Sequence, residues 1–89
     1  MLSFKVKIIN EKGLHARASA KFVELVESFD ASCEIIKNSC TVSGDSIMGL
    51  LMLSASKGST IEIKIWGAEK IELEKALRYL VSNKFGEDN

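Results

Sequence analysis

The stretch Gly13-Leu14-His15-Ala16-Arg17 joins two different patterns in this chain and holds the only histidine among its 89 residues. Before it, apolar and polar residues alternate from Leu2 to Ile8, which predicts a half-buried strand. After it, apolar residues recur at helical spacing, which predicts a helix over residues 16–28. The stretch therefore lies at a junction between a strand and a helix, and His15 stands where the helix begins.

A histidine and an arginine at such a junction suggest a site for an anion. The first turn of a helix presents unpaired backbone N–H groups and a partial positive charge, which together bind phosphate well. Arg17 adds a permanently charged guanidinium that matches phosphate oxygens. The imidazole of His15 is suited to bind a phosphate or to carry one covalently. The alternative is that His15 is an ordinary capping or surface residue.

A hairpin follows the first helix. Cys33 and Ile35 lead toward Asn38-Ser39, which predicts a two-residue turn with Ile35 opposite Val42. In this register Cys33 lies too far from Cys40 for a disulfide. We expect both cysteines to be small core residues in the reduced state.

A short apolar helix is predicted next, with Ser46 as its N-cap. Residues 47–53 are apolar on nearly every side, so the helix is either fully buried or buried on one side and exposed on the other. In the second case Leu50 and Leu53 belong to the core. The exposed residues that contact a partner would then be Ile47, Met48 and Leu51.

The rest of the chain predicts one more strand and one more helix. Ile61, Ile63 and Ile65 alternate with polar residues, and a helix is predicted over residues 69–84. We expect residues 85–89 to form a frayed acidic tail. The order β-α-β-β-α-β-α predicts an α+β domain over residues 1–89, with a four-stranded sheet that carries its three helices on one face.

Composition excludes several classes of protein. Twelve basic and twelve acidic side chains give a formal net charge of zero, which argues against nucleic-acid binding. No apolar run is long enough to insert into a membrane, and the first residues lack the apolar centre of a signal peptide. We therefore expect a cytoplasmic location. The spacing of the two cysteines and one histidine suggests no metal site.

Two motifs resemble a known family. The run Gly13-Leu14-His15-Ala16-Arg17 and the later run Asp45-Ser46-Ile47-Met48-Gly49-Leu50 resemble HPr, the histidine-containing phosphocarrier of the bacterial phosphoenolpyruvate-dependent phosphotransferase system. The resemblance extends from Phe4 to about Phe85 and implies an open-faced antiparallel sandwich. One departure is Ala18, because the family usually has proline three places after the histidine.

The resemblance implies specific roles. His15 accepts a phosphoryl group at Nδ1 from phosphorylated enzyme I and passes it to an enzyme II A-type acceptor, without a cofactor. The phosphate would be bound by the backbone of Ala16, Arg17 and Ala18 and by the Arg17 side chain, which is catalytic together with His15. Ser46 matches a residue that a dedicated HPr serine kinase phosphorylates in some bacteria. Such a protein is a covalent intermediate in transfer, and we expect it to be a monomer.

The sequence leaves two other functions open. The chain is alternatively a regulatory module that docks on target proteins according to phosphorylation at His15 or Ser46. The other alternative is a small hydrolase with His15 as a base, although no serine or cysteine nucleophile is paired with that histidine in the sequence.

If the chain is an HPr protein, residues 47–53 and Lys57-Gly58-Ser59 favour the nitrogen-regulation branch over the sugar-transport branch. The slim first helical turn, which includes Ala20, would let a partner approach His15.

Overall fold

The computed structural model describes all 89 residues and confirms the predicted order of elements. The strands are β1 (Leu2–Lys7), β2 (Ser32–Lys37), β3 (Cys40–Ser43) and β4 (Thr60–Trp66). The helices are α1 (Ala16–Glu27), α2 (Ile47–Met52) and α3 (Lys70–Ser82), and a short 3-10 helix spans Lys84–Gly86. None of the helices is both long enough and apolar enough to cross a membrane.

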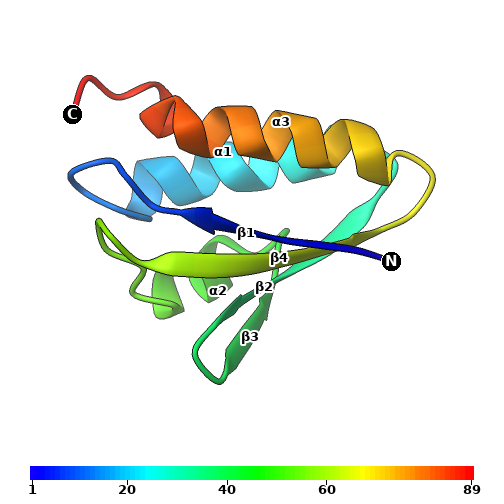
Figure 1. The fold of residues 1–89 in the computed structure, drawn as a ribbon, viewed down its shortest axis with the longest axis horizontal. Coiled ribbons are helices and arrows are strands. Elements are labelled where there is room, and N and C mark those ends of the chain that lie inside the picture. Colours follow the sequence, from blue (N-terminus) through cyan, green and yellow to red (C-terminus); the bar gives the residue numbers. More distant parts are fainter.

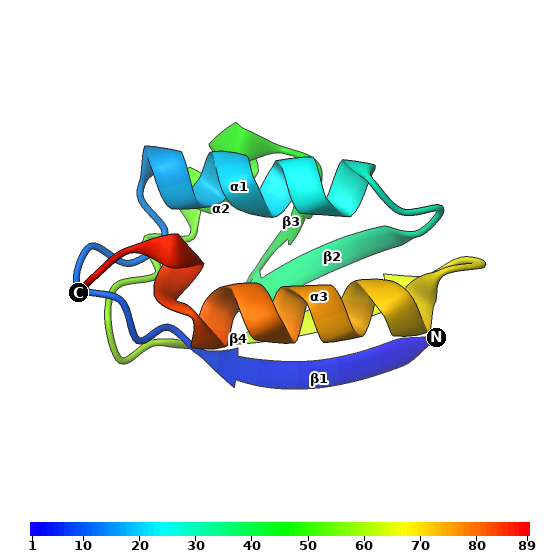
Figure 2. The ribbon, with the colours of Figure 1, turned by 90° about the horizontal axis from the view of Figure 1, so that it is seen from above.

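The four strands form one antiparallel sheet in the order β1-β4-β2-β3. Figures 1 and 2 show α1 and α3 side by side over this sheet, and α2 contacts α1 and β3. The structure is thus the open-faced α+β sandwich that the sequence predicted. The strand order is new information, because local alternation does not say which strands are neighbours.

The core lies between the sheet and the helices. Every second residue of β4 is fully buried: Ile61, Ile63 and Ile65. Burying one such side chain stabilises the fold by roughly 1.5–3 kcal/mol. The opposite face of the sheet is mostly polar, apart from Ile36 and Trp66, and Ser3 Oγ there donates to Glu62 Oε2 over 2.7 Å. The alternation of apolar and polar residues in the sequence therefore predicts correctly which face of the sheet the helices cover.

The hairpin has the predicted register. Ile35 lies opposite Val42 and the two-residue turn follows β2, with Asn38 in the left-handed region at φ 56°. Both cysteines are free, as expected. Cys33 is buried, whereas Cys40 is exposed at the start of β3, so the prediction that both are core residues is wrong for Cys40. Its position next to a hairpin turn leaves its side chain in solvent.

Helix α2 is buried on one side only. Ser46 is its N-cap, and its hydroxyl accepts a hydrogen bond from the Gly49 N–H over 3.0 Å. Leu50 and Leu53 are buried, whereas Ile47 is 41% and Met48 69% exposed. The alternative of a fully buried helix is therefore wrong. The exposed surface differs from the prediction at two residues. Leu51, predicted to be exposed, is half-buried, and Met52, which was not among the predicted contacts, is 71% exposed.

The prediction of a frayed tail is wrong. Helix α3 ends at Ser82, and the chain then turns back over α1, with Phe85 fully buried. Phe85 adopts φ 55°, in the left-handed region. That conformation costs about 1–2 kcal/mol, which the burial of a phenyl side chain offsets. Figure 2 shows the C-terminal segment beside the loop that precedes α1, where Glu11 N–H donates to Asn89 O over 3.0 Å.

Candidate functional site

His15 is the N-cap residue of α1. Its backbone is extended (φ −76°, ψ −178°), and its side chain makes no capping hydrogen bond. The first helical bond runs from Ser19 N–H to His15 O over 2.8 Å, so the N–H groups of the three residues between them have no partner within the chain. The helix therefore begins as an open group of donors beside the imidazole, as the sequence predicted.

The residues in that first turn differ in exposure. Ala16 and Arg17 are exposed, and Ala18 is fully buried. Arg17 forms no ion pair within the chain, so its guanidinium is available to an anion. Together with Lys12 and Lys21 it lines a pocket of about 390 Å³ between α1 and the C-terminal segment. Three acidic residues, Glu11, Glu87 and Asp88, line the same pocket, so its cationic and acidic side chains are equal in number, as they are in the chain as a whole.

The loop before His15 is held in one conformation. Gly13 has φ +64°, and a Cβ there would lie 2.5 Å from Ala55 O. Leu14 N–H donates to the same carbonyl over 2.9 Å. The fully buried Asn10 donates from Nδ2 to Gly13 O, also over 2.9 Å. Only glycine satisfies both the dihedral angle and the close approach at position 13, so this residue fixes the entry into α1.

The imidazole of His15 has one contact with an acidic side chain. Nε2 lies 2.5 Å from Glu87 Oε2, and the two side chains are 25% and 14% exposed. Nδ1 makes no hydrogen bond. The ring is therefore held from one side, and no hydrogen bond occupies its other nitrogen.

The Glu87 carboxyl is ionised at neutral pH. Its partial burial would raise the pKa, but hydrogen bonds from His15 and Asn10 and the charges of His15 and Lys12 outweigh that effect and lower the pKa below its usual value. Neither Glu87 nor Asn10 was predicted from the sequence as a residue of the site. The only available signal was the isolated aromatic residue Phe85, which anchors the segment that carries Glu87.

The predicted partner-contact residues lie on two helices that touch. Ala20 is half-buried in α1, and α2 packs against α1 with Ile47 and Met48 exposed. Leu51 adds a half-buried apolar side chain to the same short helix. We call these four residues the docking surface. Ser46 begins α2 and therefore lies next to this surface.

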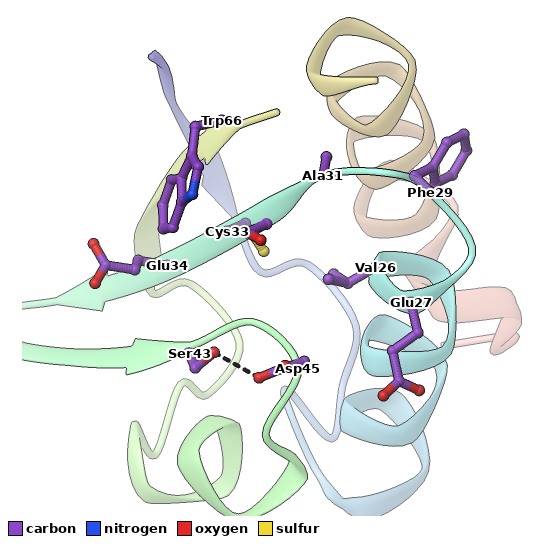
Figure 3. A pocket seen from close by; sticks show the side chains of 10 residues that line it. Val26, Glu27, Phe29, Ala31, Cys33, Glu34, Ser43, Asp45 and Trp66 are labelled. Atoms are coloured by element: carbon purple, nitrogen blue, oxygen red, sulfur yellow. Dashed lines mark hydrogen bonds between the residues drawn. The ribbon is translucent and has the colours of Figure 1, made fainter. Parts of the chain in front are cut away.

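The largest pocket lies elsewhere, at the C-terminal end of α1 (Figure 3). It holds Cys33, whose pKa is raised to about 12 by burial and by the charges of Asp45 and Glu34. A thiol that stays protonated at neutral pH is a poor nucleophile. Ser43 Oγ donates to Asp45 Oδ1 over 2.6 Å at its rim. Neither here nor elsewhere in the chain are three or more His, Cys, Asp or Glu side chains grouped so that they could hold a metal ion.

Comparison with known proteins identifies the family. The family model described as the PTS HPr component phosphorylation site matches residues 2–83. The chain belongs to the HPr family. The resemblance seen in the two sequence motifs is therefore confirmed, and the membership supports a phosphocarrier role in the phosphotransferase system.

Several HPr proteins match over nearly their whole length. The phosphocarrier protein HPr of Neisseria meningitidis serogroup A is 46% identical over 87 residues, which are 98% of each chain. The phosphocarrier protein NPr of Klebsiella oxytoca is 37% identical over 84 residues, or 93% of each chain. The crystal structure of HPr from Thermoanaerobacter tengcongensis superposes with a TM-score of 0.94 at 35% identity, covering 100% of both chains.

Proposed function

We propose that His15 accepts a phosphoryl group from phosphorylated enzyme I and passes it to an enzyme II A-type acceptor. The observation that carries this proposal is the arrangement at the start of α1: an imidazole with a free Nδ1 beside unpaired N–H groups and an unpaired Arg17. Phosphoryl transfer needs mainly positioning and compensation of charge, and this arrangement supplies both.

The transfer step follows from these positions. The lone pair of Nδ1 attacks phosphorus, and the bond from phosphorus to the donor atom breaks with its electron pair left on the donor. The N–H groups of Ala16, Arg17 and Ala18 and the Arg17 side chain are the candidates to bind the phosphate oxygens. Of the three backbone donors, Ala16 and Arg17 belong to exposed residues. The reverse of this step delivers the group to the acceptor.

The docking surface is the proposed contact for both partners. Met48 is 69% exposed on a short helix that packs against α1, and apolar groups in such a position mark contact sites. Because Nδ1 must meet two partners in turn, we expect each of them to use the same four residues. We place this exchange in the cytoplasm. The acceptor belongs either to the sugar-transport branch or to the nitrogen-regulation branch. Of the two, the sequence favours the nitrogen-regulation branch.

Ser46 gives this surface a candidate switch, which is the second proposed function. Its hydroxyl caps α2 and is only partly buried. Phosphorylation by an HPr serine kinase would add about two negative charges next to the docking surface. A phosphate at a helix N-terminus is stabilised by the helix, so the fold would tolerate it. The chain would then also act as a regulatory module whose contacts depend on its phosphorylation state.

A native gel-shift experiment tests the proposed function. Wild-type protein is incubated with phosphoenolpyruvate and enzyme I, and each component is omitted in turn. The phosphocarrier proposal predicts a stoichiometric shift that requires both components and reverses when an enzyme II A-type acceptor is added. A chain that never shifts under these conditions would contradict the proposal and favour the hydrolase alternative.

A further inference from the structure

We infer that Glu87 is a positioning residue that holds His15 in the tautomer able to accept phosphate. The inference rests on the proposed function of His15 and adds a residue that neither sequence motif contains. Its basis is the 2.5 Å contact between His15 Nε2 and Glu87 Oε2, 72 residues apart in the chain. The contact is made to Nε2, so it leaves Nδ1 free.

The C-terminal segment is fixed at three points around Glu87. Phe85 is fully buried before it, and Lys21 Nζ donates to Phe85 O over 2.7 Å. After it, Asn89 O accepts from the Glu11 N–H over 3.0 Å. Gly86 lies between these contacts with φ +80°, which a residue with a side chain rarely adopts. Because the segment is constrained in this way, the fold fixes the position of the Glu87 carboxylate.

Asn10 joins the segment to the loop that carries His15. Its side chain is fully buried, and Nδ2 donates both to Gly13 O over 2.9 Å and to Glu87 Oε1 over 3.0 Å. One carboxylate oxygen of Glu87 is therefore held by the loop while the other faces the imidazole. Positions of the loop, the ring and the carboxylate are coupled through this one amide.

The consequence for His15 follows from hydrogen-bond chemistry. An ionised carboxylate only accepts hydrogen bonds, so the Nε2 it contacts must carry the proton. The neutral ring then has its lone pair on Nδ1, where the new bond to phosphorus forms. During transfer the Nε2 proton stays in place, hydrogen-bonded to Glu87. The carboxylate also offsets the positive charge that the ring gains as the bond forms.

The test is to replace the carboxylate by an amide of the same shape. In Glu87→Gln the side chain both donates and accepts, so both tautomers of the ring are permitted. Nitrogen-15 NMR of the imidazole reads the tautomer directly, without enzyme I. Asp88→Asn is the matched control, because it removes an exposed neighbouring carboxylate that makes no hydrogen bond within the chain.

We expect wild type and Asp88→Asn to show the Nε2–H form alone, and Glu87→Gln to show a mixture of both forms. The kcat for phosphoryl transfer from enzyme I should fall about tenfold in Glu87→Gln, because the hydrogen bond to the ring loses its charged acceptor, with little change in KM. An unchanged tautomer, or a kcat equal to or above that of wild type, would overturn the inference. A wild-type chain that takes up no phosphate would instead contradict the proposed function, while its tautomer would still test Glu87.

Discussion

Phe85→Ala tests whether the C-terminal segment is part of the folded core. Phe85 is fully buried and belongs to the same apolar cluster as Phe22 and Leu77. Replacing a buried phenylalanine by alanine costs about 3–5 kcal/mol, from lost burial and from the cavity that remains. For a chain of this length, 1 kcal/mol corresponds to about 5 °C, so we expect the melting temperature to fall by roughly 15–25 °C.

The assay is thermal unfolding followed by circular dichroism, repeated with urea. Alanine at position 85 keeps the backbone at φ 55° under the same strain, so the change measures the side chain. Asp88→Ala is the control, because its exposed side chain makes no hydrogen bond, and it should change stability by no more than about 0.5 kcal/mol. A Phe85→Ala variant that melts within a degree or two of the control would refute the reasoning, since the tail would then be frayed in solution.

Three further substitutions test the site. Arg17→Ala should slow phosphoryl transfer by one to a few decades, because one charged donor in a preorganised site contributes about 2–4 kcal/mol, while thermal unfolding stays unchanged; equal transfer rates would show that the backbone N–H groups suffice. Ser46→Asp should weaken binding to enzyme I, measured by NMR titration, because it adds negative charge next to the docking surface and still caps α2; unchanged affinity would remove α2 from the interface. Ala18→Pro should raise stability by about 0.4–1 kcal/mol, because the Ala18 N–H has no helical partner and proline restricts the unfolded chain. Earlier melting of this variant would show that the buried site lacks room for the ring or that the N–H has a function.

Local patterns predicted the elements and the register of the hairpin. The alternation around Ile63 and the capping position of Ser46 depend on residues close together in the chain, and both are confirmed. Asn38 adopts a positive φ readily, which places the turn and hence sets Ile35 opposite Val42. Such features follow from a few neighbouring residues, so one sequence is enough to find them.

The order of strands and the C-terminal segment depend on distant contacts. No local pattern in the sequence indicates that β4 lies between β1 and β2. Residues 83–89 are mostly polar and have no helical or strand period, which is why the segment looked frayed. The buried side chain of Phe85 and three consecutive residues with positive φ, Lys84, Phe85 and Gly86, direct it back over α1.

The site was therefore predicted in part. The placement of His15 at the start of a helix and of Arg17 in its first turn followed from the sequence, and the structure confirms both. The contact with Glu87 was missed because nothing near residue 15 in the sequence indicates a partner 72 residues away. The roles of the docking surface and of Ser46 stay predictions that the binding experiments above address.

The central claim is that the imidazole of His15 carries the phosphoryl group. The most direct measurement compares wild type with His15→Ala after incubation with phosphoenolpyruvate labelled in its phosphate and with enzyme I. Wild type should take up one phosphate that is labile in acid and stable in alkali, as expected for a bond to nitrogen. His15→Ala should fold normally and take up none. Undiminished labelling of His15→Ala, or an acid-stable label on wild type, would contradict the account.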